Sequence, residues 1–123
     1  TAFEGVPAEF HYNPFGSVHG GFYSTILDSA FGTAVLSALG PGVGFTTLEF
    51  KINLVRPMFA DTGPVRAEAW TVHVGSRMAT VDGRIIDAAG KLYAHGNSTC
   101  MIFDTWGKDA GKNPKRPNQG EQR

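Results

Sequence analysis

Hydrophobic and polar residues alternate along several stretches in the second half of the chain, as they do in β-strands that bury one face. The alternation is clearest in residues 45–56. One face of this stretch would carry Leu48, Phe50, Ile52 and Leu54, and the other would carry Thr47, Glu49, Lys51 and Asn53. Residues 65–74, 78–87 and 91–103 predict three further strands, with Gly96 marking a β-bulge in the last one. Residues 1–10 are a weaker strand candidate, because glycine and proline interrupt them.

A different pattern fills residues 13–42, where apolar residues occupy nearly every side of one predicted long helix. The glycine pair at positions 20 and 21 would open the helix. The sequence Gly40-Pro41-Gly42 would close it, with Gly40 in the left-handed position after the last turn. The segment 22–39 is long enough to span a membrane, but its Asp28 and its several Ser and Thr residues favour burial by the domain itself and by a partner subunit.

The order of these elements indicates an α+β fold. Short connections predict that neighbouring strands lie antiparallel, and the one long helix must cover the apolar face of their sheet. A helix wrapped by an antiparallel sheet follows, over a single domain of residues 1–104. Residues 105–123 are predominantly polar and charged, and we interpret them as a flexible tail.

Composition narrows the classes of partner. The 11 basic and 11 acidic residues balance, which argues against a nucleic acid or an anionic membrane as partner. A single cysteine, Cys100, excludes an internal disulfide and fits the reducing cytoplasm. Because it lies among apolar residues of a predicted strand, it is expected in the core.

Asp28 is the residue whose chemistry conflicts most with its surroundings. No other Asp, Glu, Lys or Arg occurs between Glu9 and Glu49. A carboxylate in an otherwise apolar helix costs free energy unless it is paired or functional. Gly21, Thr25 and Gly32 share its helix face, so another backbone or a ligand could approach closely. The alternative is that Asp28 pairs with a polar group in a subunit interface.

The helix start adds a second chemical feature. Backbone N–H groups without partners at Gly20 and Gly21 could bind an anion, or the oxyanion that forms when a carbonyl is attacked; alternatively, the glycines only permit a tight turn. His19 adjoins them. The four histidines lack metal-ligand spacing, and no Gly-x-Ser-x-Gly nucleophile motif occurs. With the Asn13 amide, this set suits attack of water on an activated carbonyl, with Asp28 as general base or nucleophile.

The motif N-P-F-G-S-V-H-G-G, followed by Asp28, resembles the signature of hotdog-fold acyl-CoA thioesterases of the PaaI-like, phenylacetate-pathway type. The segments TTLEFKINLVRP and VHVGSRMATVDGRIIDAAGKLYAHGNSTCMIF resemble strands of that family. The resemblance implies that Asp28 activates water or attacks the thioester and that the Gly20 N–H is the oxyanion donor. It also implies that Asn13 lies near the carbonyl or the water, that His19 orients the loop, and that Thr47 helps to hold the water.

The same resemblance implies an acyl-CoA substrate, no metal or other cofactor, and a homodimer with sites between subunits, which pairs into a homotetramer. Gly21, Phe22 and Phe15 would bind substrate, the last two as part of an aromatic wall with Tyr23 and Phe31, although core packing is the alternative for each of the four aromatic residues. Arg56 and Arg77 would bind the CoA phosphates. The family usually has a helix and a longer first strand before the motif, so this part is expected to be trimmed or reduced here. Two other functions remain open: a hotdog hydratase or dehydratase, and a non-catalytic acyl-CoA binding module.

Overall fold

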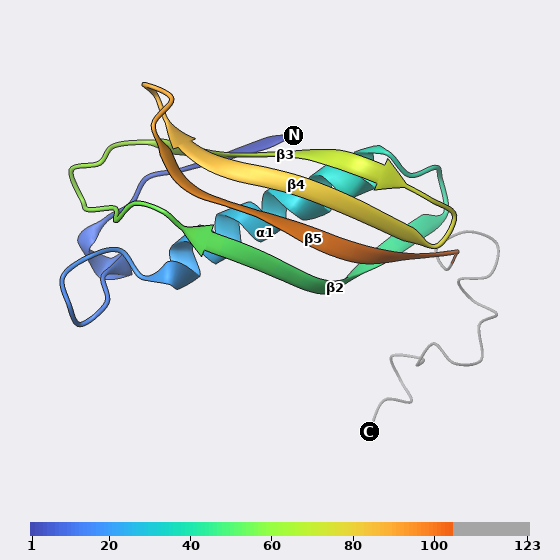
Figure 1. Cartoon of the computed structure of the whole chain (residues 1–123), viewed down its shortest axis with the longest axis horizontal. Coiled ribbons are helices and arrows are strands. Elements are labelled where there is room, and N and C mark those ends of the chain that lie inside the picture. The colour runs from blue at the N-terminus through green and yellow to red at the C-terminus, as the bar shows by residue number, and fades with distance from the viewer. Residues whose placement is uncertain (105–123) are drawn as a thin grey trace.

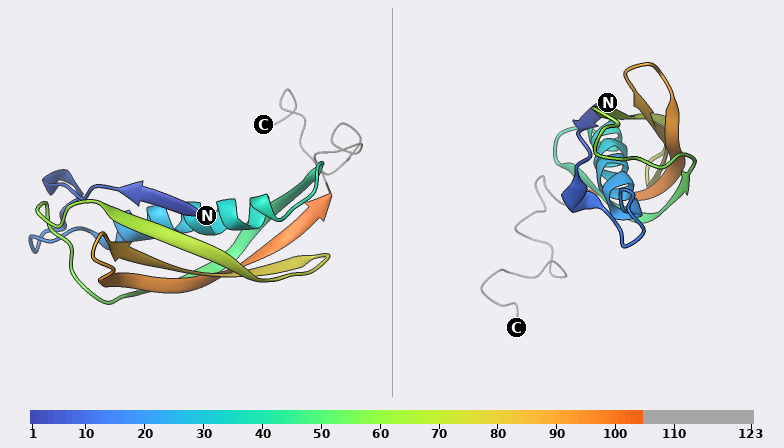
Figure 2. Two further views of the ribbon diagram at one scale, coloured as in Figure 1. Left: turned by 90° about the horizontal axis from the view of Figure 1, so that it is seen from above. Right: turned by 90° about the vertical axis from the view of Figure 1, so that its left-hand side faces the viewer.

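The computed structural model describes residues 1–104, which form one sheet and one long helix (Figure 1). The elements are β1 (Ala2–Gly5), the 3₁₀ helix η1 (Glu9–His11), α1 (Gly20–Ser37), β2 (Val43–Leu54), β3 (Val65–Val74), β4 (Met78–Asp87) and β5 (Leu92–Asp104). All strand pairs are antiparallel, in the order β1-β3-β4-β5-β2. The sheet curls around α1 (Figure 2), which confirms the predicted hotdog architecture. The interpretation of 105–123 as a flexible tail concerns residues outside those described.

Strand boundaries follow the sequence pattern closely where tight turns flank a strand. The bounds of β3 and β4 are those predicted, and β5 is shifted by one residue. The weak candidate in residues 1–10 forms the short edge strand β1, in which Phe3 pairs with Ala67 of β3. Cys100 is fully buried, as expected.

The predicted antiparallel arrangement of neighbouring strands is confirmed, and β2 departs from the order of the chain. This strand pairs with β5, not with β3, and it forms the edge of the sheet opposite β1. The connection 55–64 is long enough to cross the end of the sheet to β3. Among residues 1–104, β2 therefore has a neighbouring strand on one side only, as does β1 at the opposite edge.

A β-bulge in β2 changes which of its side chains share a face. The register shifts between Thr47 and Glu49, so the uninterrupted alternation predicted for this stretch is wrong. Thr47 pairs with the buried Cys100, while Phe50 pairs with the buried Ser98. Since cross-strand partners share a face, Thr47 lies on the inner face together with Phe50.

Gly96 is not a bulge, contrary to prediction. It pairs regularly with Gly83 of β4 and with Ile52 of β2. A Cβ atom at position 96 would collide with the backbone carbonyl of Lys51 in β2. The glycine is required because two backbones approach closely there.

The helix α1 packs one side against the sheet. Its buried residues are Tyr23, Leu27, Ala30, Phe31, Ala34 and Val35. The helix ends at Ser37, and Gly40 does not adopt the predicted left-handed conformation; Gly42 does, at φ 78°. Val43 N–H donates to Gly40 C=O across Pro41 and Gly42, which is a type II turn. No helix in the described part of the chain is both long and apolar enough to cross a membrane.

The β4–β5 hairpin contains the predicted turn at 88–90. Gly90 has φ 84°, and the Asp87 carboxylate accepts hydrogen bonds from the N–H groups of Lys91 (2.9 Å) and Ala89 (3.0 Å). The Tyr93 hydroxyl donates to the same carboxylate. The hydrogen bond from Lys91 N–H, helped by the other two, holds the pKa of Asp87 below its ordinary value.

Candidate active site

The start of α1 presents one unused backbone donor. His19 is the N-cap residue, and its Nδ1 atom accepts a hydrogen bond from Gly21 N–H at 2.8 Å. Within residues 1–104, no atom accepts a hydrogen bond from Gly20 N–H. The positive end of the helix dipole lies at the same place. Of the two glycines, Gly20 is therefore the one whose N–H can serve as an oxyanion donor. Gly21 has its N–H bonded to His19, and its lack of a side chain leaves space beside the helix start.

The Asn13 side chain holds the loop before the helix. Its Oδ1 atom accepts hydrogen bonds from Phe15 N–H (2.9 Å) and Ser17 N–H (3.3 Å), and its Nδ2 atom donates to Ser17 Oγ. The Asn13 N–H donates to Ser17 C=O at 2.7 Å. Such an Asx turn is a common role of asparagine in loops. In one copy of the chain, the carboxamide is thus used to shape its own loop.

The same loop is fastened to the connection between β2 and β3. Val18 N–H donates to Met58 C=O at 2.9 Å, and Tyr12 Oη accepts a hydrogen bond from Ala60 N–H at 2.7 Å. Met58 is completely buried beneath this contact. These anchoring residues were not identified from sequence, because the paired positions lie 40 (Val18 and Met58) and 48 (Tyr12 and Ala60) apart in the chain and only the tertiary fold brings them together.

Tyr23 makes a similar link from the first turn of α1. Its hydroxyl donates to Arg56 C=O at 2.8 Å, and burial raises the pKa of this phenol above its ordinary value, so it remains a donor at neutral pH. Tyr23 and Phe31 are core residues with 2% and 1% exposure, so they form no aromatic wall for a substrate. For these two, the core-packing alternative is confirmed.

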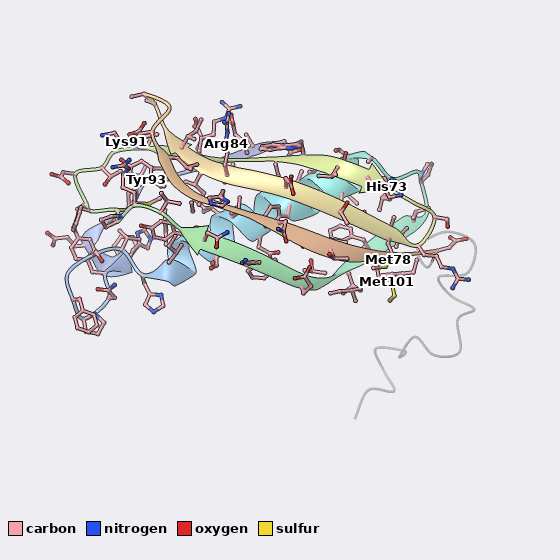
Figure 3. The ribbon with its side chains drawn as sticks, in the orientation of Figure 1. His73, Met78, Arg84, Lys91, Tyr93 and Met101 are labelled. Atoms are coloured by element: carbon pink, nitrogen blue, oxygen red, sulfur yellow. The ribbon has the colours of Figure 1, made fainter. Side chains whose placement is uncertain are left out.

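The two arginines predicted to bind phosphate lie at opposite ends of the sheet. The Arg56 Nε atom donates to Leu92 C=O, and its guanidinium lies over the Tyr93 ring at 5.9 Å, at the end where α1 begins. Arg77 precedes Met78 at the other end, as the positions of Tyr93 and Met78 in Figure 3 make clear. One copy of the chain therefore does not bring both arginines to one ligand.

Asp28 lies on the side of α1 that the sheet does not cover. It is half-buried, and Gly21, Thr25 and Gly32 on the same helix face are also at least partly exposed. Asp28 lies eight positions after Gly20, which corresponds to about 12 Å along a helix. A reacting carbonyl needs its oxyanion donor and its base both within about 3 Å. A single copy cannot supply both groups to one thioester.

Thr47 lies level with the turn of α1 that carries Asp28. The Phe45 ring packs against Gly32, where an added Cβ would be 3.2 Å away, and Leu54 approaches Gly20 at the same distance. The inner face of β2 therefore runs along the helix from its last turns to its first. Thr47, two residues beyond Phe45, falls about one helical turn from Gly32 in that direction. The residues predicted for the site thus fall into two separate groups in each copy: Asp28 with Thr47, and Gly20 with His19 and Asn13.

A groove of about 550 Å³ opens between η1 and the first two turns of α1. It is lined by Phe10, His11, Tyr12, His19, Gly21, Phe22, Thr25 and Ile26. Phe22 was predicted at a substrate site and lies in this groove, whereas Phe15, which is 94% exposed at the loop tip, does not line it. Phe10 and His11 were not identified from sequence, because a single 3₁₀ turn leaves no periodic signal.

Comparison with known proteins agrees with this architecture. A family model described as "Thioesterase superfamily" matches residues 15–94. A protein of Halobacterium salinarum assigned as an esterase is 34% identical over 76 residues, covering 60% of this chain and 48% of the relative. The chain therefore spans about half the length of that relative.

Two solved structures extend the comparison. A Bacillus halodurans protein, crystallised with CoA, is 29% identical with a TM-score of 0.76, covering 83% of this chain and 66% of its own. A phenylacetic acid degradation-related protein of Ralstonia eutropha, assigned as a thioesterase, is 30% identical with a TM-score of 0.73; the match covers 81% of this chain and 74% of that one.

Proposed function

Because the chain belongs to the thioesterase superfamily, we propose that it hydrolyses acyl-CoA thioesters to the free acid and CoA. The observation that carries the proposal is the helix start, where His19 occupies Gly21 N–H and leaves Gly20 N–H available. The CoA bound to the Bacillus halodurans relative supports CoA as part of the substrate.

We further propose that the active site forms between two copies of the chain. Asp28 and Thr47 from one copy would face Gly20, His19 and Asn13 from the other, which resolves the separation of about 12 Å within one copy. The exposed apolar side chains of the edge strand support this arrangement: Leu48, Phe50 and Leu54 are 50%, 42% and 57% exposed. A second copy would cover them. Pairing of two such dimers into a homotetramer is part of the proposal.

The proposed chemistry needs few groups, because a thioester carbonyl is more electrophilic than an ester carbonyl. Its oxygen accepts a hydrogen bond from Gly20 N–H, which stabilises the charge that develops when the carbonyl carbon is attacked. Asp28 either takes a proton from the attacking water, while Thr47 helps to hold that water, or attacks the carbonyl itself. The C–S bond then breaks, and CoA leaves as a thiolate that takes up a proton. If water is the nucleophile, this step already yields the free acid; if Asp28 attacks, its carboxylate is left joined to the acyl group as a mixed anhydride, which a water molecule then hydrolyses to the free acid and free Asp28.

The binding of CoA itself involves the arginines. Arg56 lies at the end of the sheet where α1 begins, its carbonyl accepts a hydrogen bond from Tyr23 of the first helical turn, and its guanidinium is held by Leu92 and Tyr93. Arg77 of the same copy lies at the far end, so the proposal requires that it reach CoA bound at a site shared with another copy.

The test is release of free thiol from short, long and aromatic acyl-CoAs by the wild type, Asp28→Asn and the control Asp82→Asn on the outer face of β4. Asp28→Asn should lose at least about 100-fold in kcat and keep its oligomer size, whereas the control should match the wild type. Full activity in Asp28→Asn would contradict the proposed role of the carboxylate. Absence of thiol release by the wild type would overturn the proposed function, and hydration of crotonyl-CoA would then support the hydratase alternative.

A further inference from the structure

The groove between η1 and α1 adjoins the proposed oxyanion donor. It shares His19 and Gly21 with the helix start, and it extends over Phe22 and Ile26 along the first turns of α1. A thioester whose carbonyl oxygen meets Gly20 N–H would have this groove beside it. The lining is mainly apolar and aromatic, which suits an acyl chain better than the polar parts of CoA.

His11 contributes a polar imidazole to this lining. Its Nδ1 atom accepts a hydrogen bond from Ala8 N–H at 2.9 Å, and the backbone N–H of His11 donates to Ala8 C=O at 2.9 Å. Its carbonyl accepts a hydrogen bond from His19 N–H at 2.7 Å. The His11 backbone is therefore joined directly to the residue that caps α1.

Aromatic contacts fix the orientation of the imidazole. Its centroid lies 4.3 Å from that of Phe10 and 4.5 Å from that of Phe22, in tilted stacks. Because Nδ1 already accepts a hydrogen bond, a neutral imidazole carries its proton on Nε2. No atom of residues 1–104 accepts a hydrogen bond from this Nε2–H. An oriented donor without a partner thus lies in an apolar groove.

We propose that His11 determines substrate specificity by donating its Nε2–H to an acceptor oxygen carried on the acyl chain of the substrate. The inference rests on the proposed thioesterase function and names its substrate class: acyl-CoAs whose acyl chain bears a ketone or hydroxyl oxygen beyond the thioester. The competing explanation is that His11 only caps η1 through Nδ1.

Two isosteric substitutions separate these roles. The Oδ1 atom of Asn occupies nearly the position of His Nδ1, so His11→Asn keeps an acceptor for Ala8 N–H but removes the distal donor. The amide nitrogen of Gln reaches the position of His Nε2, so His11→Gln keeps a distal donor but loses the acceptor. Each variant thus retains one of the two hydrogen bonds.

The experiment measures kcat/KM for hexanoyl-CoA and for its keto derivatives, with the ketone moved one carbon at a time along the chain. For each enzyme, the ratio of keto substrate to hexanoyl-CoA gives the discrimination, and comparison with the wild type cancels differences in intrinsic reactivity. We expect the best ratio to fall about 3- to 10-fold in His11→Asn and to change less than about twofold in His11→Gln. Thermal unfolding should show the reverse order, with His11→Gln the less stable variant.

The outcomes are distinct. Equal ratios in the wild type and His11→Asn would overturn the inference, as would a fall in both variants that follows their loss of stability. Thiol release from no thioester would overturn the proposed function itself, and this inference with it. If the wild type hydrolysed thioesters but no keto substrate depended on His11, only the proposed role of His11 would be overturned.

Discussion

Replacement of Gly20 by proline would remove the backbone N–H proposed to stabilise the oxyanion, and little else. Position 20 is the first residue of α1, where proline is favoured because its fixed φ suits a helix and its missing N–H has no partner inside the helix. The preceding residue, His19, has φ −63° and ψ 143°, an extended conformation that proline tolerates in its neighbour. We therefore expect Gly20→Pro to fold with nearly unchanged stability.

The expected loss of activity comes from a single hydrogen bond. Removal of one oxyanion donor typically costs about 100- to 1000-fold in kcat, or about 2.7–4 kcal/mol. Proline also adds a Cβ, which would lie 3.2 Å from Leu54 Cδ1. Leu54 is 57% exposed, so the end of its side chain can move aside. Gly20→Ala adds the same Cβ but keeps the N–H, and it is the matched control.

Steady-state thiol release by the wild type, Gly20→Pro and Gly20→Ala measures the effect, with urea denaturation as the check on folding. Gly20→Ala should stay within about fivefold of the wild type, while Gly20→Pro falls by at least about 100-fold in kcat. If Gly20→Pro retained wild-type kcat, another group would have to stabilise the oxyanion. If both variants lost activity equally, the cause would be steric, and the reasoning from the free N–H would fail.

Three further predictions follow from the same structure. A heterodimer with Asp28→Asn on one copy and Gly20→Pro on the other can be isolated by two affinity tags. It should recover about half of the wild-type kcat per dimer, because one of its two shared sites is intact. Activity no higher than that of the two mutant homodimers would mean that both groups of a site come from one copy. Gly96→Ala should destabilise the fold by about 1–3 kcal/mol in urea denaturation, because its Cβ would meet the backbone of β2, whereas Gly40→Ala, with no atom within 4 Å, should not; equal midpoints for the two would contradict this reasoning. The pKa of Asp87 is lower in the folded than in the unfolded chain, so the ionised carboxylate stabilises the fold at pH values above its unfolded pKa. The wild type should therefore have a higher urea midpoint than Asp87→Asn at pH 7, and this difference should disappear as the pH falls below about 4. A difference that does not depend on pH would argue against this origin.

The parts of the fold that local sequence determines could be predicted closely. The bounds of β3 and β4 are set by turns that flank them directly, even though the register of β3 against β4 shifts between Thr71 and His73. What could not be predicted depends on contacts between distant segments. The pairing of β2 with β5 depends on which sheet edge is open once the β3–β4–β5 hairpins have formed, and alternation carries no information about that choice.

Glycine illustrates the same limit at single residues. Gly96 looked like a bulge from the sequence, because a glycine inside a strand has few local explanations. The reason for it lies on another strand, at the carbonyl of Lys51. The actual bulge of β2, between Thr47 and Glu49, carries no glycine and left no local signal.

For the candidate site, too, the sequence predicted the local features and the structure added the distances between them. The motif supplied Asn13, His19, Gly20 and Asp28 without any structure, since their types and spacing are local features. The geometry then adds that His19 occupies the N–H of Gly21 and that about 12 Å of helix separates Gly20 from Asp28.

Two surfaces of one copy of the chain are left uncovered, and a second copy in one position would cover both. The small-residue face of α1 around Asp28 is uncovered, and so is the apolar inner side of β2 at Phe50 and Leu54. A second copy placed along β2 would remove the apolar side chains from water, and it would bring its own Gly20 toward Asp28 of the first copy. On this reasoning, the free energy that drives association of the subunits and the geometry that the reaction needs depend on one surface. A variant that prevents association should therefore lose activity even when every residue of the motif is intact.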